Sequence, residues 1–198
     1  MKSAIIEERD KSQCSPGRHM TRLQVGDSAP DFTLPSISGS MFNISEVRGK
    51  KIIITFFRFS SCPFCNIRIS QLIKRWNEFS DEIVMVGIFD AKINDLTKRM
   101  EHHNVPFNIL ADENYELFTK HSVQKSFLRF MIGTLSAPLT LLKATMRGYF
   151  PMTLSISKLS TIPVDILIDE NGKVVKAHYC KNTADHLSID EMVSFSNS

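Results

Sequence analysis

A pair of cysteines lies where an apolar stretch of the sequence passes into a segment with helical periodicity. Residues 52–57 are apolar at nearly every position, which is typical of a β-strand covered on both faces. The motif Cys-Pro-Phe-Cys (CPFC) follows at residues 62–65, and apolar side chains then recur at helical spacing up to residue 79. This order predicts a buried strand, a short turn and an amphipathic helix, with the two cysteines at the helix N-terminus.

The position of the CPFC motif favours redox chemistry. With Cys62 as the N-cap, Pro63 takes the first helical position, where its missing N–H is not needed. The free N–H groups of Phe64 and Cys65 and the positive end of the helix dipole then stabilise a Cys62 thiolate. Because only two residues separate the cysteines, we expect a reversible disulfide between them, with Cys62 as the more reactive thiol.

A zinc site and an inert cysteine pair both fit the CPFC motif less well than redox chemistry does. A zinc site needs four ligands, but the sequence holds no second Cys-x-x-Cys and no His-x-x-x-His pair, and Cys14 and Cys180 are widely separated. An inert pair of buried cysteines is unusual between a strand and a CPxC helix. We therefore predict no metal ion and no cofactor.

The length and composition of the chain indicate one ordinary globular domain. Its 198 residues are enough for a single core, and a net charge of +3 is too small to predict nucleic-acid binding. Residues 1–20 are polar and lack the apolar centre of a secretory signal, so we expect a disordered leader or extension before a domain at 21–198. Four cysteines do not make a disulfide scaffold, and the expected location is cytoplasmic.

The remaining periodicity predicts an α/β fold with three layers. Apolar strands alternate with helical segments along the first half of the chain, and the last third holds a β-hairpin with an Asp-Glu-Asn-Gly turn. The expected strands are 83–89, 107–110, 164–168 and 173–179, and further helices are expected to begin near residues 95, 115 and 188.

A basic segment separates these two parts of the chain. Residues 117–164 contain no Asp or Glu, and we expect residues 123–152 to form a helical insertion that covers the sheet edge. Basic residues and helix breakers leave fewer than about 18 consecutive apolar residues, so no membrane span is predicted. A homodimer surface, the rim of a site for an anionic substrate and a membrane-surface contact are the alternatives.

Several motifs together resemble a known superfamily. The segment Gly-Asp-Ser-Ala-Pro-Asp-Phe at residues 26–32, the CPFC motif, and the Ile162-Pro163 pair before the hairpin resemble the thioredoxin fold. They are most similar to the peroxiredoxin-like branch of the alkyl hydroperoxide reductase and thiol-specific antioxidant superfamily. The resemblance runs from about residue 23 to the C-terminus. It implies a central mixed sheet, with the helical insertion before a strand that begins with a cis-proline.

The resemblance leaves two assignments of the cysteines open. Peroxiredoxins carry Pro-x-x-x-Thr/Ser-x-x-Cys, and placing Cys65 last puts Cys62 at the Thr/Ser position and Arg58 at the proline. Pro163 replaces the family arginine, at a site where thioredoxins have a cis-proline. We therefore expect a thiol–disulfide oxidoreductase, with Cys62 attacking and Cys65 resolving. The alternative is a thiol peroxidase with Cys65 as the peroxidatic cysteine, and a third class is a redox-inert interaction module or a thiol-based sensor.

Four further residues are expected to support the site. Arg58 and Arg68 lie close to the cysteines in sequence and would lower the pKa of the thiolate. Pro163 in the cis form would present the Ile162 backbone to a substrate that pairs like an added strand. The expected partners are a protein or low-molecular-weight disulfide, or a hydroperoxide, as substrate, and a thiol reductant such as thioredoxin or glutathione.

Overall fold

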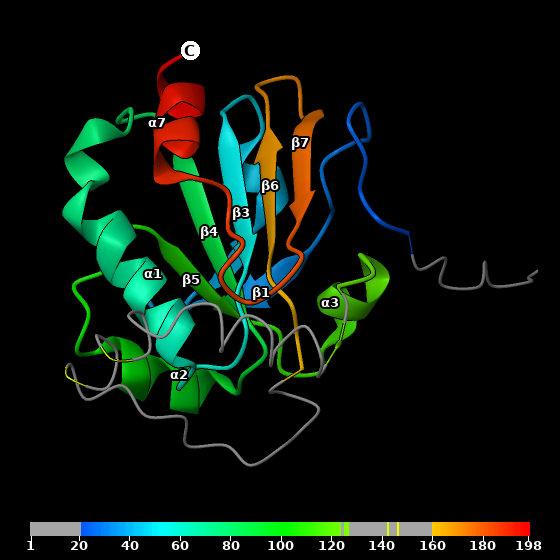
Figure 1. Cartoon of the computed structure of the whole chain (residues 1–198). Helices are drawn as coiled ribbons and strands as arrows, with labels where there is room; N and C mark the ends of the chain where they lie inside the picture. The colour runs from blue at the N-terminus through cyan, green and yellow to red at the C-terminus, as the bar shows by residue number, and fades with distance from the viewer. Residues whose placement is uncertain (1–20, 124, 127–141, 143–145, 147–159) are drawn as a thin grey trace, which may run out of the picture.

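A five-stranded sheet forms the centre of the protein in a computed structural model that describes residues 21–123, 125, 126, 142, 146 and 160–198 (Figure 1). The strand order is β5-β4-β3-β6-β7. The strands β3, β4 and β5 are mutually parallel, whereas β6 and β7 are each antiparallel to the strand before them in this order, so the sheet is mixed. The bounds of the strands are β3 Ile52–Phe56, β4 Val84–Phe89, β5 Asn108–Ala111, β6 Val164–Ile168 and β7 Val174–Tyr179.

Helices and short elements surround this sheet. Near the N-terminus, β1 and β2 pair with each other in a separate antiparallel ribbon. No helix in the described part of the chain is both long and apolar enough to cross a membrane. The remaining elements are α1 Pro63–Lys74, α2 Ile93–Met100, α3 Glu116–Lys120, α7 Ile189–Asn197, β1 Thr33–Pro35, β2 Met41–Asn43, and 3-10 turns at Ile44–Val47 and Trp76–Glu78.

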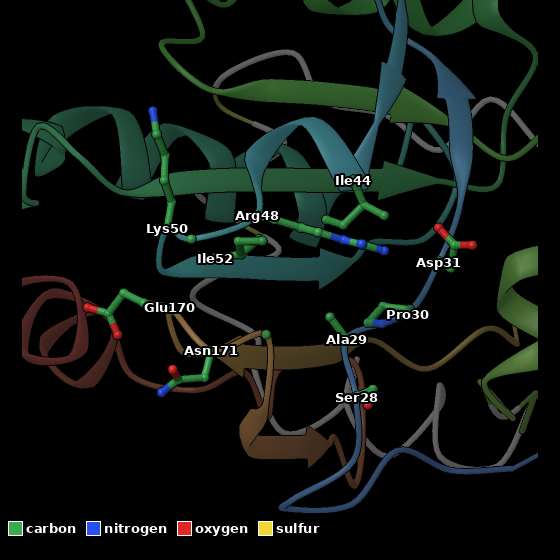
Figure 2. Close-up of a pocket in the computed structure, with 12 residues that line it drawn as sticks. Ser28, Ala29, Pro30, Asp31, Ile44, Arg48, Lys50, Ile52, Glu170 and Asn171 are labelled. Atoms are coloured by element: carbon green, nitrogen blue, oxygen red, sulfur yellow. The ribbon is translucent and has the colours of Figure 1, made fainter.

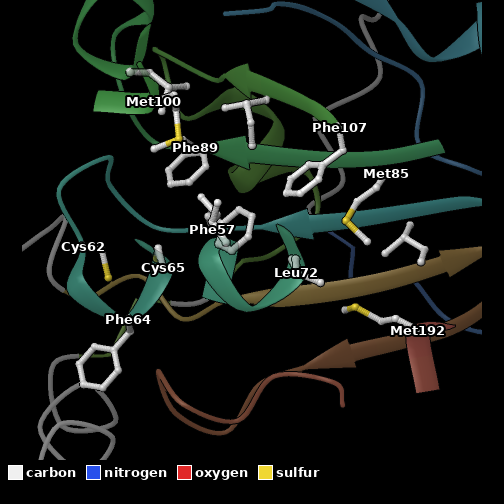
Figure 3. Close-up of a cluster of buried hydrophobic side chains, with 14 of the residues drawn as sticks. Phe57, Cys62, Phe64, Cys65, Leu72, Met85, Phe89, Met100, Phe107 and Met192 are labelled. Atoms are coloured by element: carbon white, nitrogen blue, oxygen red, sulfur yellow. The ribbon is translucent and has the colours of Figure 1, made fainter. Parts of the chain in front are cut away.

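Alternation along β3 gives the sheet two buried faces, because successive side chains of a strand point to opposite sides. Ile53 and Phe57 pack in a cluster with α1, α2 and α7 (Figure 3). Ile54 and Phe56 pack on the other face with α3 and the N-terminal ribbon. The strand is therefore apolar at every position except Thr55 for the reason inferred from the sequence, and the predicted three-layer α/β fold is confirmed.

A missing side chain in β4 makes room for Phe57, the residue that follows β3. A Cβ atom at Gly87 would lie 2.9 Å from both Phe57 Cε2 and Ile109 Cδ1. The Phe57 ring instead stacks on Phe89, with ring centroids 4.8 Å apart. This packing holds the chain in place directly before Arg58 and the cysteine loop.

The Ile162–Pro163 bond is trans, so the expected cis-proline is wrong; no peptide bond among the described residues is cis. Pro163 comes directly before β6, and its carbonyl accepts the N–H of Cys180 at 3.2 Å. A proline at the start of a strand needs no N–H for the ladder, so the extended trans chain fits this position without a bend. Ile162 is buried in this arrangement.

Two predicted segments lie largely outside the described residues. The leader predicted for residues 1–20 lies entirely outside them. The helical insertion predicted for residues 123–152 lies outside them as well, apart from residues 123, 125, 126, 142 and 146. Both remain predictions.

Candidate active site

The first turn of α1 places the cysteine pair at the end of β3. Cys62 is the N-cap of α1, with φ −66° and ψ 120°, and Pro63 follows at the first helical position, as the sequence predicts. The N–H of Cys62 donates to the carbonyl of Phe59 at 3.0 Å, which closes a turn in front of the helix. Cys62 and Cys65 both have an exposed fraction of 0% and lie in the cluster between α1 and the sheet (Figure 3).

Arg58 brings a positive charge to the Cys62 sulfur. Hydrogen bonds continue the pairing with β4 beyond the end of β3, from Phe57 N–H to the Ile88 carbonyl at 2.8 Å and from Asp90 N–H to the Arg58 carbonyl at 3.0 Å. The Arg58 side chain is almost fully buried, and its Nη1 donates to Cys62 Sγ at 3.2 Å. A guanidinium held this close to sulfur favours the thiolate over the thiol.

The two thiols have opposite pKa shifts. Burial raises the pKa of Cys62, but the hydrogen bond from the Cys65 thiol, the charge of Arg58 and the backbone N–H groups of Cys65 and Phe64 outweigh it and lower the pKa to about 6. Burial raises the pKa of Cys65 well above its ordinary value, and the hydrogen bond to Cys62 and the negative charge there raise it further. At neutral pH the pair therefore holds one thiolate, Cys62, and one thiol, Cys65.

Asn66 holds the turn that carries Cys62. Its Nδ2 donates to the carbonyls of Ser60 and Cys62 at 3.0 and 2.8 Å, and its Oδ1 lies 3.0 Å from His103 Nε2. Asn66 is buried and His103 is half-buried. The sequence carries no signal for this pair, because an asparagine in the first turn of a helix is ordinary and its partner comes 37 residues later.

Arg68 lies on α1 but turns towards the C-terminal segment. Its Nη2 donates to the Leu187 carbonyl at 2.5 Å and lies 3.4 Å from Met192 Sδ. Burial lowers the pKa of Arg68, and the charges of Asp165 and Cys180 oppose that shift. Of the two arginines predicted beside the cysteines, Arg58 is therefore the one with a hydrogen bond to the sulfur of Cys62.

The other two predicted site residues lie at the same end of the sheet. Ile162 and Pro163 come immediately before Val164, which pairs with Phe56 in the register of β3 and β6. Phe56 in turn comes shortly before the cysteine loop. The fold therefore brings this segment to the end of the sheet that carries the cysteine loop, although the proline does not have the expected isomer.

A buried polar cluster lies behind Arg68. Asp165 Oδ2 lies 3.1 Å from His186 Nδ1 and also accepts the backbone N–H that follows His186, while Oδ1 accepts the Thr55 hydroxyl at 2.8 Å. Possible ligand atoms of Asp165, Cys180 and His186 lie within 4.8 Å of one another, which is close enough for a metal site. Three hydrogen-bond partners already surround the carboxylate, however, and the nearby charge of Arg68 balances it, so the cluster needs no cation.

Two surface cavities differ in their distance from the cysteines. A cavity of about 300 Å³ lies beside the start of β3, at the end of that strand opposite the cysteine loop (Figure 2). A second cavity, of about 510 Å³, lies beside the cysteine loop and α2. Its walls are made by Phe59, Ser60, Ser61, Asp90, Ala91, Lys92, Asp95, Lys98, Arg99 and His102. This second cavity gives a small polar molecule a place to bind next to the turn that carries Cys62.

Comparison with known proteins places this geometry in a family context. Residues 25–177 match the model of the AhpC/TSA family. Peroxiredoxin Bcp of Escherichia coli (strain K12) is 28% identical over 112 residues, which cover 55% of this chain and 72% of that protein. Peroxiredoxin Bcp of Bacillus subtilis (strain 168) is 26% identical over 115 residues, which cover 56% and 73%.

Solved structures agree with the fold. The crystal structure of Peroxidoxin BcpB from Mycobacterium tuberculosis superposes with a TM-score of 0.64 and 16% identity, covering 89% of this chain and 97% of that one. The thiol peroxidase from Chromobacterium violaceum superposes with a TM-score of 0.61 and 14% identity, covering 87% and 86%. These likenesses establish the thioredoxin-like fold that the sequence motifs predict.

Proposed function

The chain belongs to the AhpC/TSA family and is a thiol-based oxidoreductase, and from this premise we propose that it reduces hydroperoxides, with Cys62 attacking and Cys65 resolving. The observation that carries the proposal is the 3.2 Å contact between Arg58 Nη1 and Cys62 Sγ. The guanidinium stabilises the thiolate before the reaction. A guanidinium carries several N–H donors in one plane, so the group that contacts the sulfur can also donate to a peroxide oxygen that lies against it.

The first step is a displacement at oxygen. The Cys62 thiolate attacks the terminal oxygen of a hydroperoxide, the S–O bond forms as the O–O bond breaks, and the leaving alkoxide or hydroxide takes a proton from solvent. The products are a sulfenic acid on Cys62 and an alcohol or water. Sulfur is oxidised by two electrons and the peroxide is reduced by two.

The second step closes the pair. Cys65 attacks the Cys62 sulfur and expels the hydroxyl group, which leaves as water with the thiol proton, so that a disulfide forms. The negative charge on Cys62 that raises the pKa of Cys65 disappears when Cys62 becomes a neutral sulfenic acid, and Cys65 then ionises more easily. An external thiol reductant, such as thioredoxin or glutathione, returns the disulfide to the dithiol.

This proposal differs from both expectations drawn from the sequence. The leading expectation was exchange with a disulfide substrate, but Cys62 is fully buried, and the trans bond before Pro163 lacks the bend that a docked peptide would use. A hydroperoxide is much smaller than a docked peptide, so a smaller movement of the loop brings it to Cys62 from the 510 Å³ cavity, which residues 59–61 line. The alternative expectation had Cys65 as the peroxidatic residue, whereas the lowered pKa favours Cys62.

Thiol–disulfide exchange by the same pair is the second candidate. The CPFC spacing and the hydrogen bond between the two thiols support it, since any disulfide that reached Cys62 would form a mixed disulfide that Cys65 resolves. Hydrogen peroxide consumption and insulin reduction, measured on the same reduced protein, distinguish the two candidates. Faster insulin reduction than peroxide consumption would favour exchange.

Cysteine variants test the assignment of the two thiols. Cys62→Ser should lose peroxide consumption, whereas Cys65→Ser should consume one equivalent and trap a sulfenic acid that dimedone labels. Cys180→Ser is the matched control, because Cys180 is also buried but lies outside the pair, and it should consume peroxide like the wild type. An active Cys62→Ser beside an inactive Cys65→Ser would reverse the assignment.

A further inference from the structure

The turn that carries Cys62 is held by a side chain of the same helix. Asn66 lies one helical turn after Cys62, and its backbone N–H donates to the Cys62 carbonyl at 3.1 Å. Its side-chain Nδ2 donates to that same carbonyl at 2.8 Å and to the Ser60 carbonyl at 3.0 Å. The two amide protons therefore bridge both ends of residues 60–62.

The hydrogen-bond pattern decides which way the Asn66 amide points. Both carbonyls are acceptors, so the NH₂ group must face them and Oδ1 must face His103. His103 Nε2 must then carry a proton and donate to Oδ1 at 3.0 Å. His103 itself is anchored, because its N–H donates to the Met100 carbonyl at 2.8 Å and its carbonyl accepts the N–H of Val105 at 2.9 Å.

We propose that Asn66 and His103 are positioning residues for Cys62: Asn66 fixes the turn at residues 60–62, and His103 fixes the orientation of the Asn66 amide. Neither side chain touches the sulfur. They act through the backbone of residues 60–62, whose conformation sets the position and direction of the Cys62 side chain. The inference rests on the proposed role of Cys62 as the nucleophile.

The geometry of the sulfur explains why such a device matters. The low pKa of Cys62 depends on the hydrogen bond from the Cys65 thiol, on the contact with Arg58 Nη1 and on the N–H groups of Cys65 and Phe64. Arg58 comes from the end of β3, and the two N–H groups come from α1. The Cys62 sulfur contacts both Arg58 and the α1 N–H groups only if the turn between strand and helix keeps its shape. A displacement of the sulfur by about 0.5 Å is enough to impair such a site.

The test measures the pH dependence of Cys62 alkylation by iodoacetamide in the reduced protein, with peptide mass spectrometry to assign the site. Asn66→Ala should raise the apparent pKa of Cys62 by roughly one pH unit, because the turn relaxes and the contacts that stabilise the thiolate lengthen. His103→Leu should shift it in the same direction. His103→Gln keeps an N–H donor and should restore the wild-type profile.

His178→Leu is the matched control, since His178 is half-buried like His103 but bonds the Asp185 carbonyl, away from the cysteine turn and its cavity. It should leave the profile unchanged. The proposal is overturned if Asn66→Ala and His103→Leu both titrate like the wild type, or if His103→Gln behaves like His103→Leu. The His103 and His178 variants decide the matter should Asn66→Ala fail to fold, which circular dichroism would reveal.

Alkylation reads the thiolate directly and needs no peroxide. A shifted profile in the variants together with a wild type that does not consume hydroperoxide would sink the proposed function and leave this inference standing. Normal peroxide turnover by the wild type, together with unshifted profiles in the variants, would support the proposed function and overturn the positioning role of Asn66 and His103.

Discussion

Replacing Arg58 by methionine is the sharpest test of the proposed chemistry. Arg58 is almost fully buried, and methionine fills much of its volume without charge or donors. The substitution removes the contact at 3.2 Å between Nη1 and Cys62 Sγ. Arg58→Lys is the matched variant, because it keeps the charge but loses the planar set of donors.

The expected fall in the rate of peroxide reduction has two causes. Arg58 is one of several groups that bring the pKa of Cys62 down to about 6, so its loss should raise that pKa by roughly one pH unit and halve the thiolate fraction at pH 7. A hydrogen bond to a charged group contributes about 1.5–3 kcal/mol, so the lost donor to the transition state slows the reaction about 10- to 160-fold. Together these predict a second-order rate constant about 20- to 300-fold lower at pH 7.

Stopped-flow measurement of peroxide reduction between pH 5 and pH 9 separates these parts. The thiolate forms as pH rises through the pKa, so the wild-type rate should rise to a plateau near pH 7, and the Arg58→Met plateau should come about one pH unit later. At high pH, where Cys62 is a thiolate in both proteins, the remaining difference in rate constant measures the loss of the hydrogen-bond donor. An Arg58→Met protein with the wild-type plateau and rate would refute the role of the contact.

Three further outcomes are expected. Mild oxidation of the wild type should remove two hydrogens from one peptide containing Cys62 and Cys65, and a pair that stays reduced would contradict the redox assignment. Gly87→Ala should lower the free energy of unfolding by about 1–3 kcal/mol in urea titrations, because the new Cβ would lie 2.9 Å from Phe57 Cε2; unchanged stability would show that the ring moves freely. Burial raises the pKa of Asp165, but His186, Arg68 and a backbone N–H lower it to about 2, below its ordinary value of 3.8. Its carboxylate therefore contributes roughly 2 kcal/mol of stability above pH 4, and this is lost as pH falls towards 2. Asp165→Asn should unfold with a shallower dependence on pH across that window, and equal slopes for both proteins would contradict the assignment.

Local sequence determined the strand, the turn and the helix that present the cysteines. Proline at the first helical position and free N–H groups at the helix start act within one turn, so the N-cap role of Cys62 could be predicted from its neighbours. The nearly continuous apolar run of β3 likewise predicted a strand buried on both faces. The hairpin followed from its turn, where Gly172 adopts a φ of 71° that suits glycine.

Only the tertiary structure decided which partners reach the sulfur. Arg58 and Arg68 are nearly equivalent in sequence, but the extended chain after β3 directs Arg58 to Cys62, whereas the helical position of Arg68 directs it to Leu187. Sequence distance cannot distinguish them, because the direction of a side chain depends on the element that carries it.

The isomer of Pro163 and the partner of Asn66 were likewise set by packing. The cis and trans forms of an X–Pro bond differ by only about 0.5–1 kcal/mol, so the strand that follows Pro163 determines the isomer. His103 meets Asn66 from 37 residues away because α2 packs beside the cysteine loop, and no local propensity encodes that contact. Short-range preferences therefore located the cysteine pair, while long-range packing selected the charge and the amide that contact Cys62.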